Sequence, residues 1–136
     1  MKFEGLYAPV ITPHEADGAI DQPAFAAQID YLIESGIHGI IVGGSTGEYY
    51  AQSIEERVDS AQKAKSVIAG RVPLIIGTGA IRQPDSLQVA RAARDMQADA
   101  ILVSTPPYAV PKRFVVARQG RLVRLCSHSI KMINVQ

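Results

Sequence analysis

The chain has 136 residues, of which 47% are hydrophobic and 20% are charged, a composition typical of one globular domain. Fourteen basic and thirteen acidic residues give a net charge of +1, so no overall charge excess indicates nucleic acid or an acidic membrane surface as a partner. The single cysteine, Cys126, excludes an intramolecular disulfide framework and a multi-thiolate zinc site. A reducing compartment, the cytoplasm, is therefore the expected location.

The amino-terminal stretch does not have the pattern of a secretory signal. It carries only Lys2 as a basic residue, and Pro9 and Pro13 interrupt its apolar run, whereas a signal needs a longer unbroken one. No window of the sequence approaches the roughly 20 apolar residues of a transmembrane helix. We therefore expect no membrane partner.

The charge changes abruptly near Pro111. Residues 1–111 carry 8 basic and 13 acidic side chains, a net of −5, whereas residues 112–136 carry 6 basic side chains and no acid, a net of +6. The first part also holds 10 of the 11 glycines and all 8 prolines. We interpret the chain as two pieces, 1–111 and a basic tail at 112–136.

Before Pro111, short apolar runs alternate with helix-length amphipathic stretches. Runs that are apolar on both faces are typical of parallel strands covered by helices. Four of them end in clusters of Gly, Ser, Thr or Pro: Leu6–Ile11, Ile37–Val42, Val72–Ile76 and Ala100–Val103.

Capping residues mark three helices between these runs. Ser53 and Glu56 form a capping box for the second helix. Further start and stop signals are Asp21 and Pro23, Gly36, Gly70, and Pro84 and Asp85. Alternation of this kind builds a parallel sheet, either an open doubly wound sheet or an eight-fold barrel. Because a barrel needs roughly 250 residues, four strands and three helices are about half of one.

The most informative stretch is the loop Gly-Gly-Ser-Thr-Gly-Glu at residues 43–48, which follows the second run. It places two hydroxyls and several backbone N–H groups at the carboxyl end of a strand, which suits a carboxylate or phosphate. A tight turn without a ligand is an equally good interpretation of this spacing. The loop is not a dinucleotide fingerprint, which would follow the first strand as G-x-G-x-x-G.

Three motifs in order resemble one family. They are G-x-x-A-P-V-I-T-P at residues 5–13, GSTGE at 44–48, and T-P-x-Y at 105–108. Together they resemble the dihydrodipicolinate synthase and N-acetylneuraminate lyase family over residues 1–111. The resemblance implies a (β/α)8 barrel that joins a lysine to pyruvate or a related 2-oxo acid as a Schiff base. Such enzymes then make or break a carbon–carbon bond, or eliminate water.

The resemblance also implies roles for individual residues. Thr46 would bind the substrate carboxylate, helped by the backbone of Ser45 and Thr46. Ser45 and Tyr108 would form a proton relay, with Tyr108 reaching a neighbouring subunit's site, and Gly44 and Gly47 would shape the loop. The implied partners are a small 2-oxo acid and further copies of the chain in a homo-oligomer. No cofactor is implied, and no cluster with metal-ligand spacing is present.

The family's Schiff-base lysine lies on a sixth strand, which we cannot find in this sequence. The tail offers Lys112 and Lys131, and Lys131 lies in the strand-like segment 129–135, but we expect neither to be the nucleophile. A shifted reading frame, an alternative exon or a truncation would each explain a tail unlike the family. We therefore expect an inactive half barrel whose first and fourth strands have open edges that favour self-association.

Two other functions remain as alternatives. A non-catalytic anion-binding or assembly protein would keep the loop at 43–48 without the lysine. A nucleic-acid binder would use the basic tail, but the tail has one aromatic residue, Phe114, and no recognisable motif. We therefore expect no nucleic-acid partner.

Overall fold

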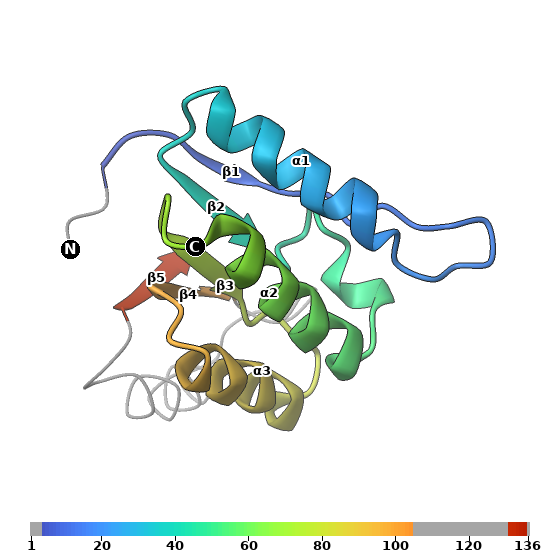
Figure 1. Cartoon of the computed structure of the whole chain (residues 1–136). Helices are drawn as coiled ribbons and strands as arrows, with labels where there is room; N and C mark the ends of the chain where they lie inside the picture. Colours follow the sequence, from blue (N-terminus) through green and yellow to red (C-terminus); the bar gives the residue numbers. More distant parts are fainter. Residues whose placement is uncertain (1–3, 105–130, 136) are drawn as a thin grey trace.

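A computed structural model describes residues 4–104 and the strand at 131–135 (Figure 1). These residues form one parallel sheet in the order β1-β2-β3-β4-β5, so each strand pairs with the next one in the sequence. The strands are β1 (Tyr7–Pro9), β2 (Gly39–Val42), β3 (Leu74–Gly77), β4 (Ala100–Ser104) and β5 (Lys131–Val135).

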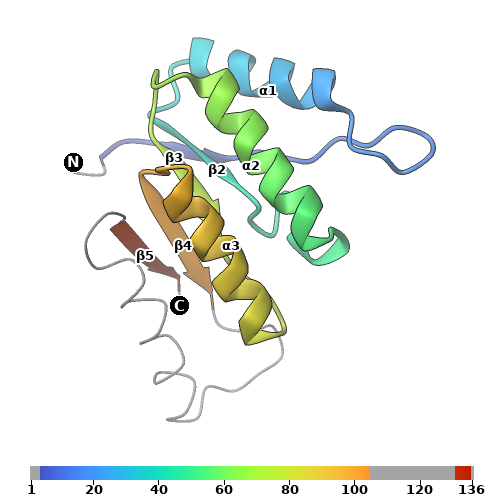
Figure 2. The ribbon, with the colours of Figure 1, turned by 60° about the horizontal axis from the view of Figure 1, so that its bottom comes forward.

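Three helices connect the first four strands: α1 (Gln22–Glu34), α2 (Ile54–Ile68) and α3 (Gln83–Asp95). A short 3-10 helix, η1 (Tyr49–Ala51), precedes α2. All three α-helices lie on the same face of the sheet in both views (Figures 1 and 2). A doubly wound sheet has helices on both faces, whereas a barrel carries them only outside, so this arrangement is the first part of a (β/α)8 barrel.

The helices begin where the sequence predicts. The Asp21 side chain caps α1 by accepting from the Ala24 N–H, and the capping box of Ser53 and Glu56 is present at α2. Helix α3 begins at Gln83, with Arg82 as an N-cap residue that makes no side-chain capping bond.

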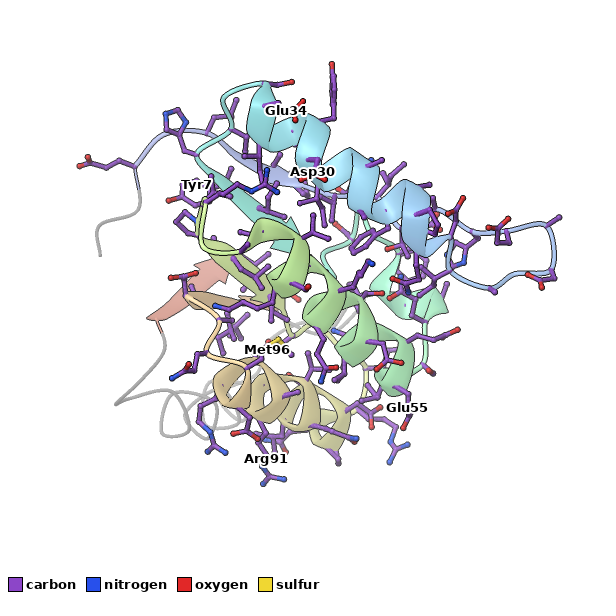
Figure 3. The ribbon with its side chains drawn as sticks, in the orientation of Figure 1. Tyr7, Asp30, Glu34, Glu55, Arg91 and Met96 are labelled. Atoms are coloured by element: carbon purple, nitrogen blue, oxygen red, sulfur yellow. The ribbon has the colours of Figure 1, made fainter. Side chains whose placement is uncertain are left out.

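The core lies between the helices and one face of the sheet. Phe25 and Ile29 of α1 are fully buried, and the alternate strand residues that face the helices, such as Ile40 and Ile101, are equally buried. Because side chains alternate along a strand, Ile41 points to the opposite face, which is the interior side of a barrel. Charged side chains such as Glu34, Glu55 and Arg91 point away from the sheet (Figure 3).

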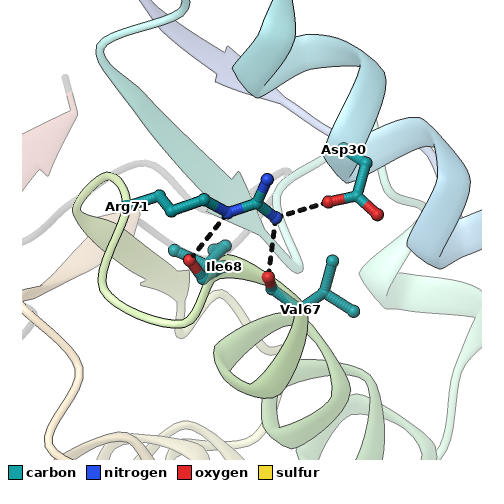
Figure 4. A network of polar contacts seen from close by, with 4 residues as sticks. All are labelled: Asp30, Val67, Ile68 and Arg71. Atoms are coloured by element: carbon teal, nitrogen blue, oxygen red, sulfur yellow. Dashed lines mark hydrogen bonds and ion pairs between the residues drawn. The ribbon is translucent and has the colours of Figure 1, made fainter.

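Arg71 ties the end of α2 to α1 (Figure 4). Its Nη2 donates to the Val67 carbonyl at 2.7 Å and pairs with the Asp30 carboxylate, and its Nε donates to the Ile68 carbonyl at 3.2 Å. The last carbonyls of a helix lack partners within the helix, so this side chain completes the end of α2.

Strand β5 corrects one expectation. The edge of β4 was expected to be open, but five residues of β5 pair with it in parallel, from Ala100 with Lys131 to Ser104 with Val135. In the described part of the sheet the edges are therefore β1 and β5. The division of the chain at Pro111 remains a prediction.

Candidate functional site

The carboxyl ends of β2, β3 and β4 surround a cavity of about 190 Å³. This is the end of a barrel sheet at which side chains and loops from several strands can meet one ligand. The cavity is lined by Gly43, Gly44, Ser45, Tyr49, Gly77, Gly79, Leu102 and Ser104.

The loop at 43–48 presents unpaired backbone donors. The N–H groups of Gly44, Ser45 and Thr46 donate no hydrogen bond to any residue that the structure describes. The carbonyls of Gly44 and Ser45 accept from the next turn, from Gly47 N–H at 3.1 Å and Glu48 N–H at 3.0 Å. Successive free N–H groups in a turn form a concave site for an anion.

Two side chains fix the far end of this loop. Thr12 Oγ1 donates to the Gly47 carbonyl at 2.9 Å, and Gln52 Nε2 donates to the same oxygen at 2.8 Å. A Cβ at Gly47 would lie 3.0 Å from the Val10 carbonyl oxygen, so a larger residue would press on the chain after β1. The loop is thus held in place from two directions before any ligand binds.

The ends of β2 and β3 approach closely at glycine. A Cβ at Gly77 would lie 2.2 Å from the Gly43 carbonyl oxygen and 3.0 Å from the Gly44 nitrogen. Backbone atoms cannot move aside as a flexible side chain can. Glycine at position 77 is therefore a requirement of the site's shape.

Arg57, from α2, is only 4% exposed. Its Nη2 donates to the Gly77 carbonyl at 3.0 Å, and its guanidinium carbon lies 5.1 Å from the centre of the Tyr49 ring. Burial lowers the pKa of the Arg57 guanidinium, whereas Tyr49 and Asp85 act to raise it. Its Nε has no hydrogen-bond partner among the described residues.

Two hydroxyls lie close to Gly79, which lines the cavity. A Cβ at Gly79 would lie 2.8 Å from Ser104 Oγ and 3.2 Å from the Tyr49 hydroxyl oxygen. Both side chains therefore reach over the bare backbone of Gly79. They give the cavity wall polar atoms that can meet an oxygen of a ligand.

The structure brings some of the predicted site residues together. Gly44 and Ser45 line the cavity, whereas Thr46 and Gly47 do not; Thr46 is exposed, and Gly47, in the same loop, is buried. Tyr108 lies outside the described residues, and so does Lys112.

Lys131 lies at the end of its strand away from the cavity. Its backbone pairs with Ala100 at the amino end of β4, whereas the cavity lies near Ser104, which pairs with Val135. Four strand residues span about 13 Å, so the Lys131 backbone is far from the cavity end of the sheet. Among the described residues, no group of His, Cys, Asp or Glu could hold a metal ion.

Sequence reasoning missed Arg57 and Ser104 as site residues, and it interpreted Tyr49, which follows the loop, chiefly as a packing or subunit-contact residue with a lesser role in lining the substrate end. Arg57 carried a usable signal, because it interrupts the apolar stripe of α2 between Ile54 and Ala61. A charged residue on a buried helix face needs a specific partner. Ser104 gave no such signal, because its place beside Gly79 joins residues distant in the sequence.

Parallel strands with helices on the outer face and a cavity at the strands' carboxyl ends define the class of (β/α)8-barrel proteins, of which this chain has the first part. The particular family follows from comparison. The model of the dihydrodipicolinate synthetase family matches residues 2–114, and the chain belongs to this family. The resemblance seen in the sequence motifs is confirmed.

Similar proteins include two kinds of enzyme. A 4-hydroxy-tetrahydrodipicolinate synthase from Methanoculleus marisnigri is 36% identical over 113 residues, which are 82% of this chain and 39% of that protein. An N-acetylneuraminate lyase from Rhizobium meliloti is 37% identical over 108 residues, 79% of this chain and 36% of that protein. The chain thus spans well under half the length of the curated relatives it matches.

A solved structure extends the comparison beyond the family motifs. YagE, a prophage protein of the dihydrodipicolinic acid synthase family from E. coli, was solved in complex with pyruvate. It matches with a TM-score of 0.89 and 32% identity, over 98% of this chain and 45% of that one. Within the described residues, no helix is both long and apolar enough to cross a membrane.

Proposed function

We propose that this chain carries the 2-oxo-acid-binding half of a Schiff-base lyase, and that the loop at 43–48 binds the carboxylate of pyruvate or a related acid. The observation that carries the proposal is the row of unpaired N–H groups on Gly44, Ser45 and Thr46 beside a cavity. Hydrogen bonds from backbone N–H to a carboxylate are charge-assisted and stronger than neutral ones. The likeness to a protein solved with pyruvate supports the same ligand class.

The hydroxyls of the site have two tasks in this proposal. Thr46 adds a hydroxyl donor to the carboxylate, and Ser45 belongs to the proton relay together with Tyr108. In a Schiff-base lyase, a neutral amine adds to the ketone carbon, and the resulting hydroxyl leaves as water when it receives a proton. A cavity with little water needs such a relay to deliver that proton.

The covalent step needs an amine that we do not assign to this chain. The Lys131 backbone lies at the amino end of β5, away from the cavity, so we propose that the 136-residue chain binds the acid without forming the imine. The same placement favours the alternative of a non-catalytic anion-binding protein. Covalent trapping of an imine distinguishes a competent enzyme from a chain that binds the acid without reacting and from a non-catalytic anion-binding protein.

Calorimetric titration of the full chain with pyruvate tests the binding step. We expect Thr46→Val to weaken binding about tenfold, the loss of one hydrogen bond to a charged group. Ser35→Ala is the matched control, because the Ser35 hydroxyl donates to the Tyr31 carbonyl at 2.7 Å near the end of α1. Absence of pyruvate binding by the wild-type chain would overturn the proposal.

Treatment with pyruvate and borohydride, followed by mass spectrometry, tests the covalent step. Reduction of an imine leaves a stable adduct on the amine that formed it. We expect no adduct on the 136-residue chain under conditions in which a full-length family lyase is labelled. An adduct on any lysine of this chain would contradict our view that it lacks the nucleophile.

A further inference from the structure

The hydrogen-bond ladder between β2 and β3 stops at the end of β2, where Gly43, with a φ of 69°, leaves the extended conformation. Ile40 N–H donates to the Pro73 carbonyl at 3.0 Å, and bonds of a parallel ladder recur every two residues. In a chain that stayed extended through Gly43, this spacing would pair Gly44 N–H with the Gly77 carbonyl. The structure instead pairs that carbonyl with Arg57 Nη2, and Gly44 N–H has no partner among the described residues.

The backbone of Gly44 lies against that of Gly77. A Cβ placed on Gly77 would lie 3.0 Å from the Gly44 nitrogen, so the two backbones are in contact. A backbone N–H beside a carbonyl with no other donor closes the hydrogen bond, since buried polar groups seldom remain unpaired. With Arg57 bound to the Gly77 carbonyl, the Gly44 N–H stays outside the sheet.

A purely structural role explains Arg57 poorly. It is buried in a stripe of apolar residues, makes no ion pair within the described part of the chain, and keeps one nitrogen unpartnered. An apolar side chain would fill this space without the cost of burying a charge. Unlike an apolar side chain, the Arg57 guanidinium donates a hydrogen bond from α2 to the Gly77 carbonyl. The Tyr49 ring packs against the guanidinium and holds it in place.

We propose that Arg57 is a positioning residue of the anion site: it occupies the Gly77 carbonyl and so keeps the Gly44 N–H free for a ligand carboxylate. That a carboxylate binds the free Gly44 N–H rests on the proposed function. That Arg57 keeps the Gly77 carbonyl from the Gly44 N–H does not. Arg57 itself does not line the cavity. It acts on the ligand only through the backbone of the loop.

Amide hydrogen exchange of the isotope-labelled full chain, followed by NMR without ligand, tests whether Arg57 keeps the Gly44 N–H unpaired. In the wild-type chain we expect the Gly44 amide to exchange rapidly, and the Val42 amide, within β2, to be protected. In Arg57→Met and Arg57→Gln the freed carbonyl takes the Gly44 N–H, so that its exchange slows at least about tenfold. Arg57→Lys keeps a cationic donor and is expected to retain the rapid exchange.

Arg71→Met is the matched control, because it also removes a guanidinium that donates to backbone carbonyls, at the other end of α2. A variant that only loosens the fold speeds exchange, whereas the proposal predicts slower exchange at one amide. Protection of Gly44 in the wild-type chain would overturn the proposal even if no Arg57 variant folds. Unchanged Gly44 exchange in a folded Arg57→Gln chain would also overturn it.

Titration with pyruvate gives the second readout. We expect Arg57→Gln to bind pyruvate about tenfold more weakly, the loss of one charge-assisted hydrogen bond, and Arg57→Lys and Arg71→Met to bind it as the wild type does. If the wild-type chain does not bind pyruvate, the proposed function fails, and the exchange experiment still decides the role of Arg57. Equal affinity of Arg57→Gln and the wild type for pyruvate would contradict a role of Arg57 in carboxylate binding.

Discussion

The Gly47 carbonyl shows how single side chains fix the anion loop. It accepts from both Thr12 and Gln52, one from the segment after β1 and one from the segment before α2. We expect Thr12→Val to lower the free energy of unfolding by about 1 kcal/mol, because one buried hydrogen bond is lost and the other remains. Pyruvate binding should weaken as well, since the loop loses one of its two supports.

The matched control for that variant is Thr78→Val, whose hydroxyl donates to the Leu102 carbonyl at 3.2 Å and does not touch Gly47. Urea denaturation should give a similar loss of stability for the two variants, and calorimetry should show weaker pyruvate binding only for Thr12→Val. Equal binding by the two would mean that Thr12 supports the fold and not the loop.

Gly77 gives a prediction of a different kind. We expect Gly77→Ala to destabilise the chain by roughly 1–3 kcal/mol, because its Cβ would overlap the Gly43 carbonyl, 2.2 Å away. Gly44→Ala is the comparison, since its Cβ would meet only the Ile41 Cγ2 atom at 3.9 Å, an ordinary contact. Thermal unfolding of both variants would test this, and equal melting temperatures would show that the ends of β2 and β3 can separate.

At the scale of residues, the sequence predicted the loop and missed its support. Gly44 and Ser45 were recognisable because glycines and hydroxyls after a strand have a known chemical use, and both line the cavity. Arg57 was not recognised, since its partner Gly77 is 20 residues away and the pairing depends on where β2 leaves the sheet. The pairing between β2 and β3 determines which N–H groups stay free. The local sequence does not encode that pairing.

At the scale of elements, Arg71 is the clearest case of one side chain serving two helices. We expect Arg71→Met to lower the free energy of unfolding by about 1 kcal/mol, through the loss of its bonds to the Val67 and Ile68 carbonyls. Asp30→Asn removes only the ion pair, whose side chains are 41% and 47% exposed, so its effect should be at most about half as large. Chemical denaturation of both variants separates the two contributions, and equal losses would assign the stability to the ion pair.

The elements themselves were largely predictable. The four apolar runs became β1 to β4 with their ends shifted by up to two residues, and the capping box of Ser53 and Glu56 formed as expected. The side of the sheet on which helices pack could not be read from periodicity, which left the open sheet and the barrel as alternatives. The pairing of β5 with β4 was missed because it joins segments about 30 residues apart.

At the scale of the whole molecule, the described sheet has two free edges and one face without helices. Strands β1 and β5 each pair on one side only, and the three α-helices all cover the other face (Figure 2). Ile41 lies on the face without helices and is partly exposed. Free edges and uncovered apolar side chains both favour pairing with a second copy.

We therefore expect the 136-residue chain to self-associate, with a sedimentation coefficient that rises with concentration. Ile41→Lys would place a charge on the face without helices and should shift the chain towards the monomer. Ile81→Lys is the matched control, since Ile81 is 78% exposed in the segment before α3 and already tolerates water. A monomer at all concentrations would contradict the expected self-association. Equal association of the two variants would mean that the copies join at the edges of β1 and β5 and not through this face.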